Sequence, residues 1–418
     1  MSVEARPSLW RVPAVQRLVG VTLLGFVGFA ATLAALPWWA VRGGATVAQA
    51  GLVTTAMLTA TVLTQTVVPA LVARVGSARS LALGLVALGA PSPLLLLSSD
   101  LLPLLAVNAV RGTGFAVLTV VGSTLTWTFA PPGRHGETAG IYGLAIGLSG
   151  VVVVPASVAV AQQVGFWPVA LVATLPVLAV PSALRMARDE EARGAETRDE
   201  RASDGPGVGD AGRSRGPRAP RQARAVLTVL VPSLVLLSVT LAGSGVVTFL
   251  PIERPDGLVA PAALLLFGAT GAVSRWRAGA LADRVGTRLL LPAAVVATAL
   301  GVAGVGAGLL SGGPGMVLAA AALAGAGHGA VQNLTLVQAF ARVEPADTPT
   351  ASAVWNLCFD GGTAVGAVAV GAAAAALADP AAGDGASGIA AALLLCAVLV
   401  LVMAPVGLRT APARPGAV

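Results

Sequence analysis

The chain contains no lysine, and it has only two histidines and two cysteines among its 418 residues. Without lysine there is no Gly-Lys-Ser loop to cradle a nucleotide phosphate, so ATP hydrolysis by that route is excluded. Cys358 and Cys396 lie inside long apolar segments, where a disulfide framework has no place, and they show no metal-ligand spacing. We therefore expect neither a cofactor nor a bound metal.

Charged residues are also scarce, at 11% of the chain, whereas 56% of the residues are hydrophobic and the mean hydropathy is +0.84. A soluble domain cannot bury so much apolar surface, and this composition is typical of membrane proteins. Twelve mostly apolar segments are each long enough to cross a hydrocarbon core of about 30 Å as a helix. They span approximately residues 18–40, 46–73, 79–99, 101–130, 137–164, 166–187, 225–250, 257–282, 287–311, 314–342, 350–377 and 385–408. The sequence thus predicts an all-α membrane protein with 12 transmembrane helices.

The formal net charge of +7 rests on arginine alone, which we attribute to coding bias. The arginines fall in alternate connections, ten of them from Arg185 to Arg224, while the opposite connections hold only Arg42 and Arg254. Because cytoplasmic loops carry the excess of positive charge, both termini and the central connection are expected in the cytoplasm. The positive net charge therefore reflects the orientation of the chain in the membrane, and we expect no nucleic-acid partner. We expect a multi-pass protein of the bacterial plasma (inner) membrane.

The hydrophobic pattern of the first half of the chain is repeated in the second half. Gly112–Ala116 and Gly325–Gly329 are similar at an offset of 213 residues, and Pro69–Gly76 and Gly279–Gly286 are similar at an offset of 210. Between the copies lies a charged segment rich in glycine and proline, a composition that cannot form a packed core. We expect an N-terminal six-helix bundle at 1–187, a disordered cytoplasmic linker at 188–224, a C-terminal six-helix bundle at 225–410 and a disordered tail at 411–418.

One connection carries a specific motif, in the predicted turn between the eighth and ninth spans. Its residues are Gly279, Asp283, Arg284, Gly286 and Arg288. The pattern Gly-x-x-x-Asp-Arg-x-Gly-x-Arg resembles the loop signature of the major facilitator superfamily. The first-half copy keeps Arg74 and Gly76 but has Ala73 in place of the acid. The resemblance implies two six-helix bundles related by a pseudo-two-fold axis around a central cavity that opens alternately to each side. It also implies that this loop locks one face.

Ionisable groups at membrane depth are functional candidates by default. The candidates for proton coupling are Asp360, Arg111 and His328. Asp360 is the only carboxylate well inside a span, although Arg275 offers a structural ion pair as the alternative role. Arg111 resembles the arginine of the proton-antiporter motif on the fourth helix. For His328, a hydrogen-bonded structural role is an equal alternative to a proton relay.

Polar and amphipathic residues of the spans are candidates for the substrate cavity, with helix packing as the alternative for each. They are Tyr142, Trp355, Asn108, Gln332, Asn333 and Asn356. Gln65 is equally ambiguous. On the fifth span, Gly143, Gly147, Gly150 and Pro155 are similar to the glycine-proline motif of antiporters.

The resemblance implies a secondary transporter similar to the 12-helix drug:proton antiporter branch, exporting a small amphipathic molecule against proton entry. Proton-coupled uptake and a non-transporting sensor or scaffold are the alternatives, and the retained intramembrane polar groups disfavour the sensor. An intramembrane protease using Ser244 and His328 is disfavoured because no nucleophile motif orders the pair. We expect no enzymatic activity. The expected partners are a small-molecule substrate, protons and the lipid bilayer, with the protein acting as a monomer.

Overall fold

The computed structural model describes residues 12–129, 135–186, 188, 218–255, 257–344, 348–378 and 386–409. Over these ranges the secondary structure consists of helices and turns without strands, and twelve helical spans are long and apolar enough to cross a membrane. The predicted all-α fold with twelve spans is confirmed.

The elements up to residue 186 form what we call the N-terminal group. They are α1 (Pro13–Leu33), α2 (Ala35–Arg42), α3 (Val47–Gln65), α4 (Val68–Val75), α5 (Ser77–Gly89), the 3-10 helix η2 (Ser92–Leu96), α6 (Leu101–Thr128), α7 (His135–Leu148), the π-helix η3 (Ser149–Val153), α8 (Val154–Gln163), α9 (Trp167–Val172) and the 3-10 helix η4 (Leu175–Ala179). Several spans are therefore built from two or three pieces. Proline explains these breaks: Pro69, Pro93, Pro155 and Pro176 each stand at the start of a later piece, where the missing N–H interrupts the helical hydrogen bonds.

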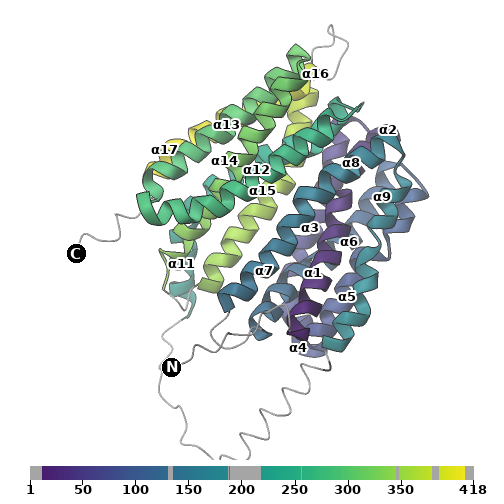
Figure 1. Ribbon diagram of the computed structural model, residues 1–418, viewed down its shortest axis with the longest axis vertical. Helices are drawn as coiled ribbons and strands as arrows, with labels where there is room; N and C mark the ends of the chain where they lie inside the picture. The colour runs from purple at the N-terminus through teal and green to yellow at the C-terminus, as the bar shows by residue number, and fades with distance from the viewer. Residues whose placement is uncertain are drawn as a thin grey trace, which may run out of the picture.

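The later elements form the C-terminal group. They are α11 (Arg218–Glu253), α12 (Val259–Val285), α13 (Thr287–Ser311), α14 (Pro314–Phe340), α15 (Thr348–Leu377), α16 (Ala386–Val402) and α17 (Ala404–Arg409). The two groups stand side by side, and most of their long helices run along one common direction (Figure 1). This arrangement gives the molecule two ends.

Two glycine turns mark one of these ends. Gly76 joins α4 to α5 with φ 90°, and Gly286 joins α12 to α13 with φ 78°. Such values favour glycine because a Cβ is strained there, so the tight turn predicted at Gly286 is present. The two glycines are 210 residues apart and occupy equivalent places in the two groups. We call this the linker end, and the opposite end, with turns at Gly44, Gly165, Gly257 and Gly312, the far end.

Helix packing repeats with the same offsets. Gly112 on α6 packs against the Met57 carbonyl on α3, and Gly325 on α14 packs against the Phe267 carbonyl on α12. The glycines are 213 residues apart and their partners are 210 apart. In each group, the glycine has no Cβ, so the backbone of the neighbouring helix can occupy the space that a side chain would fill. The duplicated sequence therefore folds into duplicated contacts.

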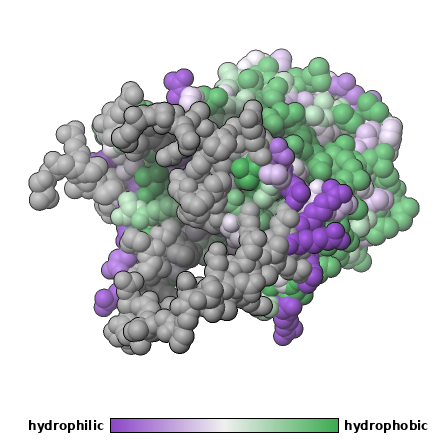
Figure 2. All heavy atoms as spheres, turned by 60° about the horizontal axis from the view of Figure 1, so that its bottom comes forward, coloured by the Kyte–Doolittle hydropathy of each residue, from purple (hydrophilic) through white to green (hydrophobic). Residues whose placement is uncertain are grey.

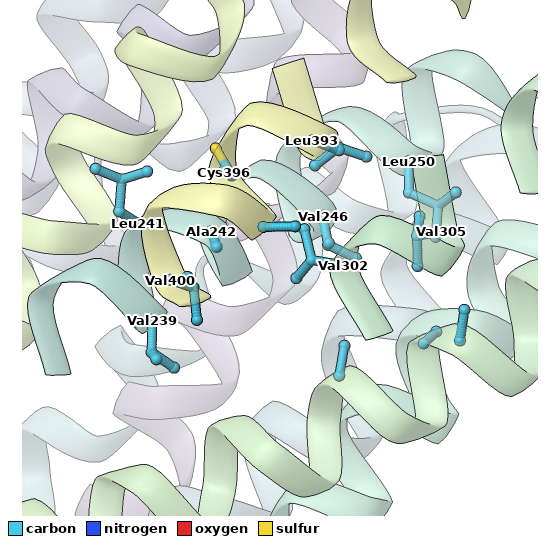
Figure 3. Close-up of a cluster of buried hydrophobic side chains, with 14 of the residues drawn as sticks. Val239, Leu241, Ala242, Val246, Leu250, Val302, Val305, Leu393, Cys396 and Val400 are labelled. Carbon is cyan, nitrogen blue, oxygen red and sulfur yellow. The ribbon is translucent and has the colours of Figure 1, made fainter. Parts of the chain in front are cut away.

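The core of the C-terminal group is aliphatic. Val239, Ala242 and Val246 of α11 face α13 and α16 in the buried cluster of Figure 3. Cys396 lies in the same cluster and is buried as a free thiol, which agrees with a packing role.

The outer surface is also apolar. Leu97, Leu102 and Trp276 are each more than 70% exposed, and the visible flank in Figure 2 is largely hydrophobic. A soluble monomer rarely exposes apolar patches of this kind, whereas lipid tails cover them. The exposed flank therefore fits a protein whose sides face the bilayer.

Candidate functional site

A cavity of about 250 Å³ lies between the two groups. The N-terminal group lines it from α1, α3, α6, α7, η3 and α8, and the C-terminal group lines it from α11, α12, α14 and α15. Because both groups supply the wall, any movement of one group against the other changes the cavity.

The N-terminal wall is mainly aromatic and aliphatic. Phe29 and Phe115 stack with ring centroids 4.0 Å apart, and Phe26 meets Phe115 edge to face at 5.4 Å. Rings in these arrangements support one another and present flat apolar surface. This side of the cavity therefore suits an apolar or aromatic part of a ligand.

The C-terminal wall carries hydroxyl groups whose protons are already engaged. Ser244 Oγ donates to the Thr363 carbonyl at 2.8 Å, and Thr363 Oγ1 donates to the Phe359 carbonyl at 2.9 Å. Thr240 Oγ1 donates to the Leu236 carbonyl at 3.1 Å. A hydroxyl that donates in this way can still accept through its oxygen. These three hydroxyls thus offer acceptors to the cavity.

Asp360 is on the same wall, and it is the only carboxylate among the described residues that line the cavity. Its Oδ2 accepts a hydrogen bond of 3.3 Å from Nε2 of Gln65, which lies at the end of α3 in the other group. The helices run in opposite directions and Cβ atoms tilt toward helix N-termini, so the two side chains lean toward each other. Asp360 therefore joins the groups while facing the cavity.

Arg275, the alternative partner expected for Asp360, is engaged elsewhere. Its Nη1 donates to Gln332 Oε1 on α14 at 2.9 Å. In this arrangement Asp360 and Arg275 have different partners.

His328 also lines the cavity, beside the Phe267 ring at 5.3 Å between centroids. The side chain occupies space left by Gly243, because a Cβ there would stand 2.9 Å from the imidazole. The imidazole Nδ1 is buried without a hydrogen-bond partner among the described residues. His328 is thus packed into the wall with one polar atom unsatisfied.

Arg111 is fully buried and is not part of the cavity wall. Its guanidinium donates to the carbonyls of Gly28 at 2.9 Å and Leu88 at 3.1 Å, to Thr32 Oγ1 at 2.8 Å and to Asn108 Oδ1 at 2.9 Å. These acceptors are neutral and come from α1, α5 and α6. Arg111 therefore ties together three helices of the N-terminal group, of which α1 and α6 carry the phenylalanine wall.

The aromatic candidates are not on the cavity wall either. Trp355 is buried, donates from Nε1 to Thr335 Oγ1 at 3.1 Å and stacks on Phe359 at 5.7 Å. Tyr142 packs on Gly122, where a Cβ would stand 2.7 Å from the hydroxyl. Neither residue lines this cavity, although Trp355 supports a residue that does.

The amide candidates are likewise off the wall. Asn108 Nδ2 donates to the Val53 carbonyl at 2.7 Å, and Gln332 accepts from Arg275. Asn333 Oδ1 is buried without a partner among the described residues, and Asn356 is exposed and donates to the Ser352 carbonyl of its own helix at 2.8 Å.

The gating loop is described in part. Gly286 makes the turn reported above, and Arg288 is exposed. The surroundings of Gly279, Asp283 and Arg284 lie outside what the structure describes, so their locking role stays a prediction.

Two seams join the groups. Along the first, Gly51 of α3 packs against the Ala367 carbonyl of α15, and Thr55 Oγ1 donates to the Ala364 carbonyl at 2.6 Å. Along the second, Gly268 of α12 meets Val151 of η3, with 3.2 Å between its ideal Cβ position and the Val151 Cα. These contacts lie between the middle of the molecule and its far end.

Two side-chain hydrogen bonds join the groups at the far end. Gln162, next to the last residue of α8, donates from Nε2 to two carbonyls of the other group, those of Pro251 at 3.0 Å and Arg254 at 3.1 Å. Because these carbonyls end α11 and have no helical partner of their own, an amide donor stabilises them. At the far end the two groups are therefore in direct contact.

Some features of the site were not anticipated from the sequence. The Phe26, Phe29 and Phe115 cluster gave no signal, since phenylalanine is ordinary in an apolar span. The π-helix η3 contributes Ser149 and Gly150 to the wall. Its signal was the nearby Pro155, since a wide turn can absorb a proline and π-turns are frequent at functional sites.

Twelve spans in two repeated groups, with a cavity walled by both, define a multi-pass membrane protein of the transporter class. The sequence comparison agrees: the profile described as "Major Facilitator Superfamily" matches residues 18–367, most of the chain. The chain belongs to the major facilitator superfamily. It is accordingly a transporter embedded in a membrane, with a small-molecule substrate, and not an enzyme.

Solved structures share the fold over nearly the whole chain. A bacterial homologue of the human lysosomal transporter Spinster, in an inward-facing and unoccupied conformation, is similar with TM-score 0.76 and 16% identity, covering 97% of this chain and 98% of that one. The nucleoside transporter NupG gives TM-score 0.69 at 14% identity, covering 95% and 98%. A mutant of the peptide transporter POT in complex with sulfate gives 0.66 at 16%, covering 99% and 98%. No curated protein matched by sequence.

Proposed function

We propose that this transporter exports a small amphipathic organic molecule in exchange for protons, as members of the drug:proton antiporter branch do. The observation that carries the proposal is Asp360, the one carboxylate on the described cavity wall. A carboxylate can bind and release a proton, and this one is hydrogen-bonded to the opposite group through Gln65. A change in its charge therefore acts directly on the contact between the groups.

Alternating access is supported by where the groups touch. The seams at Gly51 and Gly268 and the Gln162 hydrogen bonds lie from the middle to the far end. Of the inter-group contacts described above, only the hydrogen bond between Gln65 and Asp360 lies nearer the linker end. If the linker end faces the cytoplasm, this is a conformation closed to the outside. The similarity to a Spinster homologue described as inward-facing fits the same interpretation.

Among the remaining candidates we assign different roles. His328, which lines the cavity, acts at the substrate or proton site. Arg111 acts as a positioning residue, since it ties α1 and α6, which carry the phenylalanine wall, to α5. Asp283 and its loop hold the linker end closed in the opposite conformation. Tyr142, Trp355 and the amide candidates reach the cavity in that second conformation.

We further propose a monomer in the bacterial plasma membrane, with the bundles at 1–187 and 225–410, the tether at 188–224 and both termini in the cytoplasm. Single cysteines introduced at positions 200 and 254 of a variant lacking Cys358 and Cys396 test the orientation. An impermeant maleimide added to intact cells should label position 254 and leave position 200 unlabelled. Labelling at 200 overturns the orientation.

The transport direction is tested in cells with and without the protein, over a panel of small organic compounds with an Asp360→Asn control. We expect cells that produce the protein to accumulate less of at least one compound than cells without it. A protonophore, or the Asp360→Asn substitution, should raise the accumulation to the level of cells without the protein. Higher accumulation in producing cells would mean uptake. An unchanged panel would favour a sensor or scaffold.

A further inference from the structure

The cavity is divided between two kinds of surface, and this division indicates the ligand's chemistry. The N-terminal wall offers the rings of Phe26, Phe29 and Phe115. The C-terminal wall offers the oxygens of Thr240, Ser244 and Thr363, whose protons are already donated to backbone carbonyls, and a carboxylate. A ligand that pairs with these three hydroxyl oxygens and with the carboxylate must bring donors, because acceptors facing acceptors would remain unpaired.

One donor already occupies the carboxylate. The Gln65 amide reaches Asp360 from the other group and makes a hydrogen bond of 3.3 Å, which is just longer than the usual range for N–H to oxygen bonds. An alkylammonium offers three donors and a full positive charge, so it bonds a carboxylate more strongly than a neutral amide does. A cationic ligand can therefore replace the amide.

The size of the cavity limits the rest of the ligand. A cavity of roughly 150 Å³ accommodates benzene, so about 250 Å³ provides room for one ring and a short chain. An aromatic ring suits the phenylalanine wall, and Phe359 beside Asp360 can face the cation. Arg275 donates to Gln332 and is not on the cavity wall.

We propose that the substrate is a compact monocation with one aromatic end, and that Gln65 is a placeholder whose amide the substrate's ammonium displaces from Asp360. Binding of such a substrate breaks a hydrogen bond between the two groups and loosens them for the next step of the cycle. This inference deepens the proposed function and rests on it. It adds the substrate class and a role for Gln65.

Binding to purified protein in nanodiscs tests the proposal, by isothermal titration with 2-phenylethylammonium, the neutral 2-phenylethanol and the bulky cation rhodamine 6G. The ammonium should bind at least about tenfold more tightly than the alcohol, since a hydrogen bond to a charged group is worth more than a neutral one. Asp360→Asn should remove that preference, and rhodamine 6G should not compete. Equal affinity for ammonium and alcohol, or competition by rhodamine 6G, overturns the substrate class.

Gln65→Leu tests the placeholder. It should tighten ammonium binding by about fivefold, because the competing donor is gone, and leave the alcohol unchanged. Thr55→Val is the matched control, since it removes another inter-group hydrogen bond from the same helix without touching Asp360. Weaker ammonium binding in Gln65→Leu, or the same gain in Thr55→Val, overturns the placeholder.

Failure of this inference is distinguishable from failure of the proposed function. If the cell panel finds a transported compound but 2-phenylethylammonium does not bind, the substrate class is wrong and the transport proposal stands. If it binds with the predicted preferences but no compound moves, the site assignment stands and the transport proposal is wrong.

Discussion

Arg111 shows how a buried charge is accommodated without a carboxylate partner among its hydrogen bonds. Its guanidinium donates to two carbonyls, one hydroxyl and one amide oxygen. The planar group with five donors in fixed directions suits such a set, whereas an ammonium cannot reach acceptors on three helices at once. The resemblance to an antiporter arginine is thus accompanied by a clear structural role.

We expect Arg111→Lys to lower the stability of the protein by about 3 kcal/mol, because at least one or two acceptors lose a charged donor worth roughly 1.5 to 3 kcal/mol each. Thermal unfolding in detergent measures the effect. Arg288→Lys, the same change at an exposed position, should leave the midpoint unchanged. An unaltered midpoint in Arg111→Lys would mean that the network contributes little.

Depth in the membrane was enough to find Asp360 and His328 from the sequence, because ionisable residues are rare in apolar spans. Membrane depth did not show whether Trp355 or Asn356 faces the cavity, and neither residue lines it. In a lipid-facing helix both faces are apolar, so periodicity does not tell which face meets the cavity. The phenylalanine wall was invisible for the same reason, since Phe29 in an apolar span has many equivalent explanations.

At the scale of elements, glycines decide how closely helices approach. Gly361 and Gly362 are neighbours on α15 with opposite surroundings. A Cβ on Gly361 meets nothing within 4 Å, while one on Gly362 collides with Thr240 Oγ1 and the Leu237 carbonyl of α11. This contact helps set the distance between α11 and α15.

The pair provides a matched test. Gly362→Ala should destabilise the protein by about 2 kcal/mol, because an overpacked helix contact typically costs 1 to 3 kcal/mol. Gly361→Ala should stay within about 1 kcal/mol of the parent, since it adds a methyl in open space and removes a flexible glycine. Unfolding midpoints of both variants check this, and equal midpoints would contradict the packing described for α15.

The sequence predicted the repeated elements well where local chemistry is specific. Gly76 and Gly286 make equivalent turns because a positive φ favours glycine in both copies. The pieces within a span were harder to foresee: Pro155 indicates a break but not that the five residues before Val154 form a π-helix. That outcome depends on the neighbouring helices of both groups.

For the whole molecule, the seam between α3 and α15 has to open if the groups move. Gly51 packs against the Ala367 carbonyl, so a larger residue there keeps the two helices apart. We expect Gly51→Val to fold but to lose transport, and a cysteine at Ala48 to become labelled from outside. Gly20→Ala on α1, where a Cβ meets nothing within 4 Å, is the control. Normal transport by Gly51→Val would show that this contact need not form.

Twelve spans, the repeat and the family could be predicted because each rests on composition or on an unusual motif. The relation between the groups could not, since Gly51, Thr55 and Ala367 are unremarkable in apolar helices. Gln65 was ambiguous for a related reason: its role depends on a carboxylate 295 residues away. Contacts across such distances appear only once the chain is folded.

The central claim is that Asp360 couples substrate movement to protons. Its most direct test uses proteoliposomes, an imposed pH gradient and the compound that the cell panel identifies. The account predicts that Asp360→Asn abolishes gradient-driven accumulation while exchange of substrate across the membrane stays measurable. Accumulation by folded Asp360→Asn protein at the parent rate would contradict it and remove Asp360 from the mechanism.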